Sequence, residues 1–156
     1  MAFATIKQVL YEGDNILSGF EANASIEPGQ VVGFAASGVS WEVGPLDGTA
    51  GERPVGVALY GAKDGDKVAI AGDGCIVYTM ADAAIDAGDY VEVSNISNAG
   101  AVMPVTEITN VSSNTSLTVT YSRNAYIVGM ALEDISAGST GRIVIRPSVR
   151  QVINVE

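Results

Sequence analysis

The chain has 156 residues and a formal net charge of −10, from 18 acidic and 8 basic residues. This balance argues against nucleic-acid binding, which depends on clustered Lys and Arg side chains. The sequence contains no His, which excludes Ser-His-Asp triads, Cys-His pairs and His-based metal sites.

The first segment, residues 1–24, is predicted to be an N-terminal arm. Its apolar side chains precede the first regular strand pattern and are Phe3, Ile6, Val9, Leu10 and Tyr11. The segment has no apolar run long enough for a signal peptide or a membrane-spanning helix. We therefore expect synthesis in the cytoplasm, no membrane partner, and no export except as part of a larger assembly.

From residue 30 onward, short runs of alternating apolar and β-branched residues predict an all-β fold, a compact barrel or sandwich with little helix. Clusters of Gly, Asp, Asn or Ser separate most of these runs. The predicted strands cover residues 30–35, 39–43, 54–60, 67–71, 75–80, 90–94, 116–122, 126–132 and 142–147. One helix-like stretch, "MADAAIDAG" at 80–88, predicts one or two helical turns that end at Gly88.

Two of these runs are nearly the same. "VGVALYGAKDG" at 55–65 aligns without a gap with "VGMALEDISAG" at 128–138. Gly56 and Gly129 fall in mid-strand, which predicts a bulge, a bend or a close approach of another backbone. The match keeps the apolar residues and glycines and changes the charged ones, so it is typical of a scaffold rather than of a reactive site.

A second match extends the repeat. "SIEPGQVV" at 25–32 aligns with "AIDAGDYV" at 84–91, in the same order relative to the first pair. We therefore predict a β-domain over 25–147 made of two similar halves. The parts are residues 25–80, residues 84–147 and an insertion near 106–122. Two explanations remain open. Either two duplicated halves pack around a shared core, or the same type of strand and turn arose independently in both places.

The polar loop 61–67, "GAKDGDK", matches neither of the two ligand-binding motifs that its composition suggests. It lacks the Gly-Lys-Ser/Thr ending that a phosphate-binding loop requires. Asp64, Asp66 and Asp73 do not follow the spacing of a calcium-binding loop. We expect a hairpin loop and no metal site.

Candidate catalytic groups are equally sparse. Asp47, Glu52 and Asp134 fall near predicted loops, but no spacing marks two of them as an acid and base pair. Cys75 is the only cysteine, so no internal disulfide forms, and its apolar neighbours predict a buried, inert thiol. The sequence favours a protein that is not an enzyme and needs no cofactor.

The last segment, residues 148–156, is predicted to be a C-terminal tail with Val149, Val152 and Ile153. Apolar residues outside both halves must be covered. Either the two terminal segments complete the barrel, or they pair with another subunit by strand addition. Both alternatives remain open, and the terminal residues named above are our candidates for contacts with a subunit or a partner.

Several stretches in a fixed order carry a resemblance to a known family. They are "YEGDNI" (11–16), "IEPGQVV" (26–32), "ERPVGVAL" (52–59), "AIDAGDYVEV" (84–93) and "VGMALEDISAGSTGRIVIRP" (128–147). Over about residues 11–147 the chain resembles the small head-decoration, or capsid cement, proteins of tailed viruses. The resemblance implies a homotrimer on the outside of the virus head, bound to the major capsid protein where capsomers meet at threefold and quasi-threefold points. It implies no catalytic residues.

A second hypothesis is a receptor- or carbohydrate-binding module of a virion fibre or spike. Trp41 together with Tyr60, Tyr78 or Tyr126 would then stack on the faces of sugar rings. Packing in the core is the alternative role of these aromatic residues. The position and copy number on the virion distinguish the two functions, because a cement protein covers the head and a fibre does not.

Overall fold

The computed structural model describes residues 6, 8–35, 38–105 and 119–155 and confirms the all-β prediction. These residues form strands and connecting loops and contain no helix. The strands are β1 (Leu10–Glu12), β2 (Ile16–Ala22), β3 (Val31–Phe34), β4 (Glu42–Pro45), β5 (Arg53–Ala58), β6 (Lys67–Ala71), β7 (Ile76–Met80), β8 (Tyr90–Val93), β9 (Val102–Pro104), β10 (Val119–Ala131) and β11 (Thr140–Val155).

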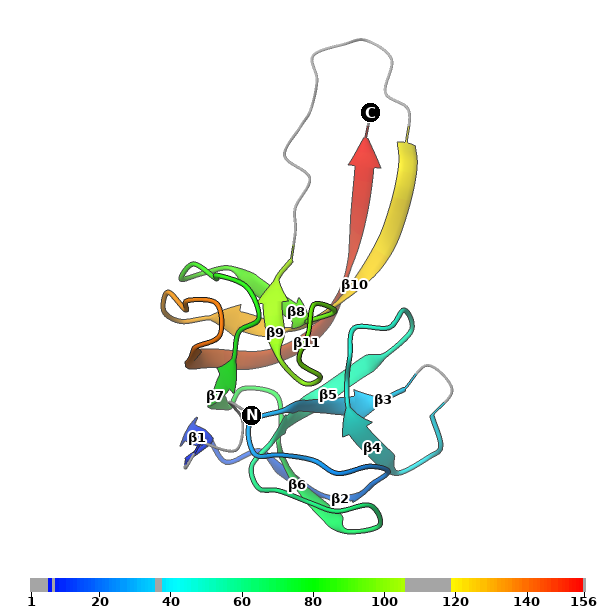
Figure 1. Cartoon of the computed structure of the whole chain (residues 1–156), viewed down its shortest axis with the longest axis vertical. Helices are drawn as coiled ribbons and strands as arrows, with labels where there is room; N and C mark the ends of the chain where they lie inside the picture. The colour runs from blue at the N-terminus through cyan, green and yellow to red at the C-terminus, as the bar shows by residue number, and fades with distance from the viewer. Residues whose placement is uncertain (1–5, 7, 36–37, 106–118, 156) are drawn as a thin grey trace.

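The first half of the chain forms a closed barrel in the order β2-β4-β3-β5-β6 (Figure 1). An antiparallel ladder joins β2 to β6, and a short parallel pairing of Ala22 with Val43 joins β2 to β4 and closes the barrel. Closure leaves no unpaired sheet edge among these strands. Its own core is built from small and β-branched residues such as Val32, Val68 and Ile70.

The second half forms a six-stranded sheet in the order β1-β7-β11-β10-β8-β9. Its core residues, among them Val77, Val91 and Ile143, belong to one cluster with Val31 and Val57 of the barrel. The barrel and the sheet therefore share a hydrophobic core. Cys75 is a buried free thiol in this cluster, as the sequence predicted.

Three buried hydrogen bonds reinforce the junction between the barrel and the sheet. The Thr79 hydroxyl on β7 donates a hydrogen bond of 2.7 Å to the carbonyl oxygen of Gly29. The Gly100 N–H donates to Leu46 O at 2.6 Å, and Val31 N–H donates to Gly100 O at 2.9 Å. Because each of these buried groups has a partner, the hydrogen bonds offset the cost of removing the groups from water.

The stretches that match in sequence make the same backbone contacts in the two halves. Ile26 and Ala62 exchange N–H···O bonds of 2.8 and 3.0 Å, and Ile85 and Ile135 exchange bonds of 2.9 and 2.8 Å. These residues occupy matched positions of the two alignments. The shared ancestry of the halves stays a prediction, but their hydrogen-bonding frame is the same at these positions.

Gly56 and Gly129 lie where another backbone approaches closely, one of the three explanations the sequence left open. A Cβ on Gly56 would collide with the carbonyl oxygen of Ala71, and a Cβ on Gly129 would collide with that of Val144. Only glycine fits such a contact. The strand register also shifts between Ile127 and Gly129.

The helical prediction for residues 80–88 is wrong. The N–H of Ala81 donates to Ser139 O at 2.9 Å, and the N–H of Ile85 donates to Ile135 O. Backbone groups that bind a distant segment cannot also form a helical ladder. Gly88 stands at a turn with φ of 91°, the left-handed conformation that glycine adopts readily.

Candidate assembly surfaces

The outer parts of β10 and β11 form a two-stranded ribbon that projects from the body of the molecule (Figure 1). Along it, Tyr126 pairs with Val149, Arg123 with Val152 and Ser122 with Ile153. The body strands β7 and β8 pair with β10 and β11 only as far out as Ile127. We call residues 119–126 and 149–155 the ribbon.

A break in the ladder separates the ribbon from the body. The register between β10 and β11 shifts between Ile127, which pairs with Ser148, and Gly129, which pairs with Ile145. Pro147 lies in the bulged segment of β11, where its missing N–H leaves no ladder bond unmade. Bulges of this kind bend a strand and increase its twist, so the ribbon is re-aimed at this point.

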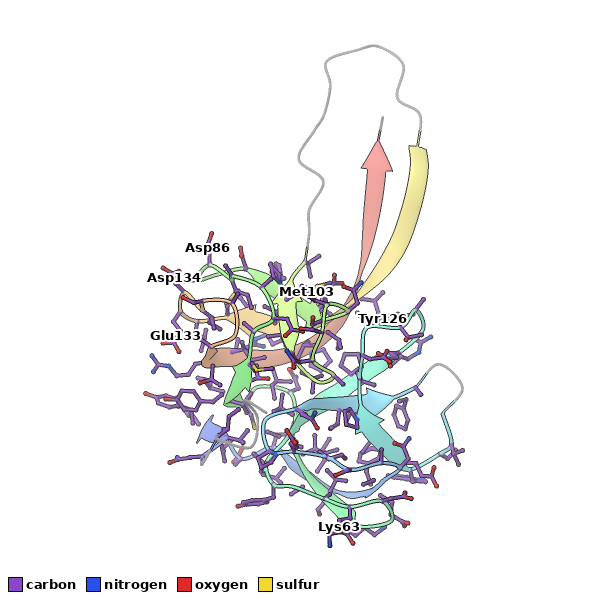
Figure 2. All side chains as sticks on the ribbon, in the orientation of Figure 1. Lys63, Asp86, Met103, Tyr126, Glu133 and Asp134 are labelled. Carbon is purple, nitrogen blue, oxygen red and sulfur yellow. The ribbon has the colours of Figure 1, made fainter. Side chains whose placement is uncertain are left out.

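The predicted C-terminal tail is therefore part of a long strand. Val149, at the base of the ribbon, exposes 59% of its surface. Val152 and Ile153 lie farther along the same strand. The opposite base residue is Tyr126, whose ring lies under the Arg53 guanidinium, with 4.9 Å from Cζ to the ring centroid (Figure 2).

The N-terminal residues lie against the sheet half. Val9 is 3% exposed in the shared core, and its carbonyl oxygen accepts a hydrogen bond of 2.8 Å from the Tyr78 N–H. Ile6 and Leu10 pack against the same cluster, and β1 pairs with β7 at the edge of the sheet. Phe3 lies outside the described residues.

Tyr11 is the candidate N-terminal residue that turns outward, with 51% of its surface exposed. It packs edge-on against Tyr78, with ring centroids 6.0 Å apart, and the Arg142 guanidinium lies over it at 4.9 Å. Glu133 holds Arg142 through two contacts, 2.7 Å to Nη2 and 3.2 Å to Nε. These hydrogen bonds lower the pKa of Glu133 and raise the pKa of Arg142.

The carboxylates that the sequence singled out brace loops. Glu52 accepts from the N–H groups of Asp47 and Gly48 at 3.1 and 2.9 Å. Burial raises the pKa of Glu52, although these two hydrogen bonds act to lower it. Hydrogen bonds from the hydroxyl and the N–H of Thr49 lower the pKa of Asp47. Asp134, at the left edge of the sheet half in Figure 2, accepts a hydrogen bond of 2.9 Å from the Ala87 N–H.

No group of three or more acidic or Cys side chains that could hold a metal ion occurs among the described residues. Within the same part of the chain, no helix has the length and apolar character needed to cross a membrane.

The aromatic residues of the second hypothesis are not brought together as one group. Tyr78 packs on Tyr11, and Trp41 packs beside Phe20 with ring centroids 5.3 Å apart. Trp41 instead lines an open pocket at the end of the barrel, together with Phe34 and Arg53. The sequence analysis missed Phe20, Phe34 and Arg53, because they come from three separate segments and no local pattern unites them.

Comparison with known proteins gives a family and a fold. The model of the phage cement protein family matches residues 12–147. The solved structure of the N-terminal base of head fiber gp8.5 in bacteriophage phi29 is similar, with a TM-score of 0.54 and 17% sequence identity. The alignment covers 84% of this chain and 94% of that one. No curated protein matches the sequence. The chain therefore belongs to the phage cement protein family and is a structural protein of the virion.

Proposed function

We propose that the protein binds the outside of the viral capsid as a trimer, at threefold and quasi-threefold junctions between capsomers, and stabilises the shell. The family match and the likeness to a head fiber base support a place on the virion surface. The observation that carries the trimer is the ribbon, because its strands pair only with each other among the described residues.

A two-stranded ribbon is marginally stable in water when nothing covers it. Three copies around a threefold axis can cover one another's ribbons and close into a finite assembly. Val149, Val152 and Ile153 are then subunit contacts. The exposure of Val149 at the base of the ribbon fits this role.

The N-terminal candidates divide into two roles in this proposal. Ile6, Val9 and Leu10 pack against their own core and fix the path of the segment. Tyr11 faces outward on the rigid support of Tyr78 and Arg142, and we assign it, with Phe3, to the contact with the major capsid protein.

The energetic effect of such binding follows from mass action and multivalency. A trimer presents three identical contacts at once, so weak contacts reinforce one another through effective concentration. A protein that binds only the assembled shell stabilises it by about 2.7 kcal/mol per site when its concentration is 100 times the dissociation constant. This gain, repeated over the head, opposes the pressure of the packaged genome.

Light scattering during size-exclusion chromatography tests the trimer. We expect a trimer for the natural sequence and a monomer for Val149→Asp, since a charge in a subunit contact is strongly unfavourable. Tyr60→Asp is the matched control, because Tyr60 is exposed at 70% on the barrel, away from the ribbon, and should leave the trimer intact. A monomeric natural protein, or a trimeric Val149→Asp variant, contradicts the proposal.

Co-sedimentation with purified capsids that lack the protein tests the capsid contact. The Tyr11→Ala variant should remain a trimer. Its affinity for capsids should fall by at least about tenfold, which is the loss typical of a buried aromatic anchor. Circular dichroism confirms that the variant is folded. Binding equal to that of the natural sequence removes Tyr11 from the contact.

A further inference from the structure

The end of the barrel carries an aromatic pocket that the assembly function leaves unused. It has a volume of about 510 Å³ and is lined by Phe20, Phe34, Ser40, Trp41 and Arg53, among others. The pocket is wide open to solvent, so a ligand bound there would lie against one face and would not be enclosed.

Trp41 is held in a backbone conformation that is unusual for a residue with a side chain. Its φ is 66°, and no other non-glycine residue in the described ranges has a positive φ. The Glu42 N–H bonds the Val39 carbonyl oxygen across Trp41 at 3.3 Å, so Trp41 occupies a turn position that ordinarily takes Gly or Asn. The side chain remains 66% exposed, so burial does not offset the backbone strain. Strain retained in this way points to a function.

Phe20 fixes the indole in place. Their ring centroids are 5.3 Å apart with an angle of 39° between the planes, and Phe34 packs edge-on against Phe20 at 5.8 Å. The Trp41 carbonyl oxygen also accepts a hydrogen bond of 2.8 Å from the Glu21 N–H. The indole is thus a supported, outward-facing platform.

Hydrogen-bond donors beside the indole are available to a ligand. Neither the indole N–H of Trp41 nor the Ser40 hydroxyl has a hydrogen-bond partner within the described part of the chain. Among the same residues, Arg53 pairs with no carboxylate and contacts the Tyr126 ring instead. An arginine that pairs with no described carboxylate and lies beside an aromatic pocket favours an anionic ligand.

We propose that this pocket binds an acidic sugar residue, with the ring stacked on the exposed indole of Trp41 and the carboxylate held by Arg53. A flat aromatic surface accepts the C–H face of a sugar ring, and the free indole and hydroxyl groups can bond its hydroxyls. The guanidinium recognises a carboxylate through two parallel hydrogen bonds. This activity goes beyond capsid stabilisation and does not depend on it.

Trp41 also makes the test direct, because the chain has one Trp and its fluorescence reports on this pocket alone. The full-length protein is titrated with glucuronic acid, with a trimer of galacturonic acid and with glucose. We expect saturable changes in emission for both acidic sugars, with a dissociation constant on the order of 1 mM for the single ring. Glucose should bind about tenfold more weakly, since it lacks the charged hydrogen bond.

Two variants separate the platform from the charge. Trp41→Gly suits the positive φ, keeps the fold and should remove the heat of binding in calorimetry. Arg53→Gln should erase the preference for glucuronic acid over glucose. Tyr60→Ala removes an equally exposed aromatic residue elsewhere and should bind like the natural sequence.

Three outcomes overturn the proposal. The first is no saturable change in emission with either acidic sugar, and the second is equal binding of glucose and glucuronic acid. The third is saturation by a Glu-rich peptide when the sugars fail, which makes the pocket a peptide site. Co-sedimentation of the Trp41→Gly variant with capsids distinguishes sugar binding from the proposed capsid binding. The variant should lose the sugar and bind capsids as the natural sequence does.

Discussion

The closed barrel and the six-stranded sheet use the same neighbour order but end differently. Strands β2-β6-β5-β3-β4 of the barrel follow one another as β7-β11-β10-β8-β9 do in the sheet. In the barrel, a parallel pairing of β2 with β4 closes the ring. In the sheet, the corresponding contact is a single parallel bridge between Ala81 and Val102.

The additions to this common frame all fall on the sheet half. The strand β1 lies on the outer edge of β7, and β10 and β11 extend beyond the body as the ribbon. The comparison teaches that the elements we assign to assembly are additions to the frame and not parts of it. One copy of it is closed, and the other remains open enough to carry the elements that we assign to assembly.

The largest expected effect tests whether the two frames are equivalent. Gly56→Ala and Gly129→Ala each place a Cβ against a backbone carbonyl, which cannot move aside as a side chain can. We expect each variant to lose about 3 kcal/mol of unfolding free energy, or to fail to fold. Urea unfolding followed by circular dichroism measures the loss.

The matched controls for that pair are Gly65→Ala and Gly138→Ala. Both positions have open space for a Cβ and positive φ values of 85° and 77°. They should lose only about 1 kcal/mol each, from backbone strain. Natural stability in one of the two mid-strand variants would show that the frames differ where we describe them as alike.

A second prediction concerns the junction between the barrel and the sheet. Thr79→Val removes the buried hydroxyl that bonds Gly29 O and leaves that oxygen without this donor. We expect a loss of roughly 1–3 kcal/mol in urea unfolding. Thr140→Val, at an exposed position of the same sheet, is the control and should stay within about 0.5 kcal/mol of the natural protein. Equal stabilities for the two variants would contradict a role of Thr79 in the junction.

A third prediction uses a position where the halves differ in charge. Asn23 in the barrel aligns with Asp82 in the sheet. The Asp82 carboxylate accepts bonds from the Ser94 hydroxyl and the Asn98 amide, both at 2.6 Å, and from the Asn98 N–H at 3.0 Å. Burial raises the pKa of Asp82, but the bonds from Asn98 and Ser94 outweigh it, so the pKa is lowered on folding.

The sign of the pH effect follows from this shift. A carboxyl whose pKa is lower in the folded state stabilises the fold above its unfolded pKa, about 3.9 for Asp, and loses that effect as pH falls. Asp82→Asn should be roughly 1 kcal/mol less stable than the natural protein at pH 7. The gap should narrow below about pH 4, as seen in urea unfolding at several pH values. A gap that is constant down to pH 2 would refute the assignment.

The smallest expected effect compares one ion pair in each half, partly buried in the sheet and exposed in the barrel. In the sheet, Glu133 forms a bidentate ion pair with Arg142. In the barrel, Lys67 forms an ion pair with Glu21 through one contact of 3.0 Å. Glu133→Gln should lower the melting temperature slightly at low salt, and Lys67→Gln should leave it unchanged. In 1 M NaCl the difference should vanish, because salt screens surface charges. A larger effect for Lys67→Gln would reverse the ranking.

The sequence was most informative where strands are regular and least informative at their ends. Runs such as 67–71 and 75–80 predicted β6 and β7 closely, because alternation of apolar residues directly reports a half-buried strand. No strand was predicted at β1, β2 or β9. The first and last have three residues each, and β2 alternates polar and apolar residues too weakly.

The candidate sites were less predictable, for a physical reason. The ribbon appears in the sequence as two short strands and a tail, and only pairing across distant segments makes them one element. The pocket depends on the φ of Trp41 and on Phe20 and Arg53 from other strands. Contacts between distant segments leave no periodic pattern in the sequence. Gly56 and Gly129 could be singled out because each lies in a copy of the same local motif.

The barrel has one further consequence, for the order in which the chain folds. All five of its strands come from one uninterrupted stretch, Ile16–Ala71, so the ring can close as soon as that stretch has left the ribosome. Val31, Leu46 and Val57 on its outer side remain uncovered until the sheet docks on them. We therefore expect the nascent barrel to act as a template, because its exposed apolar face offers the second half a surface on which to pack.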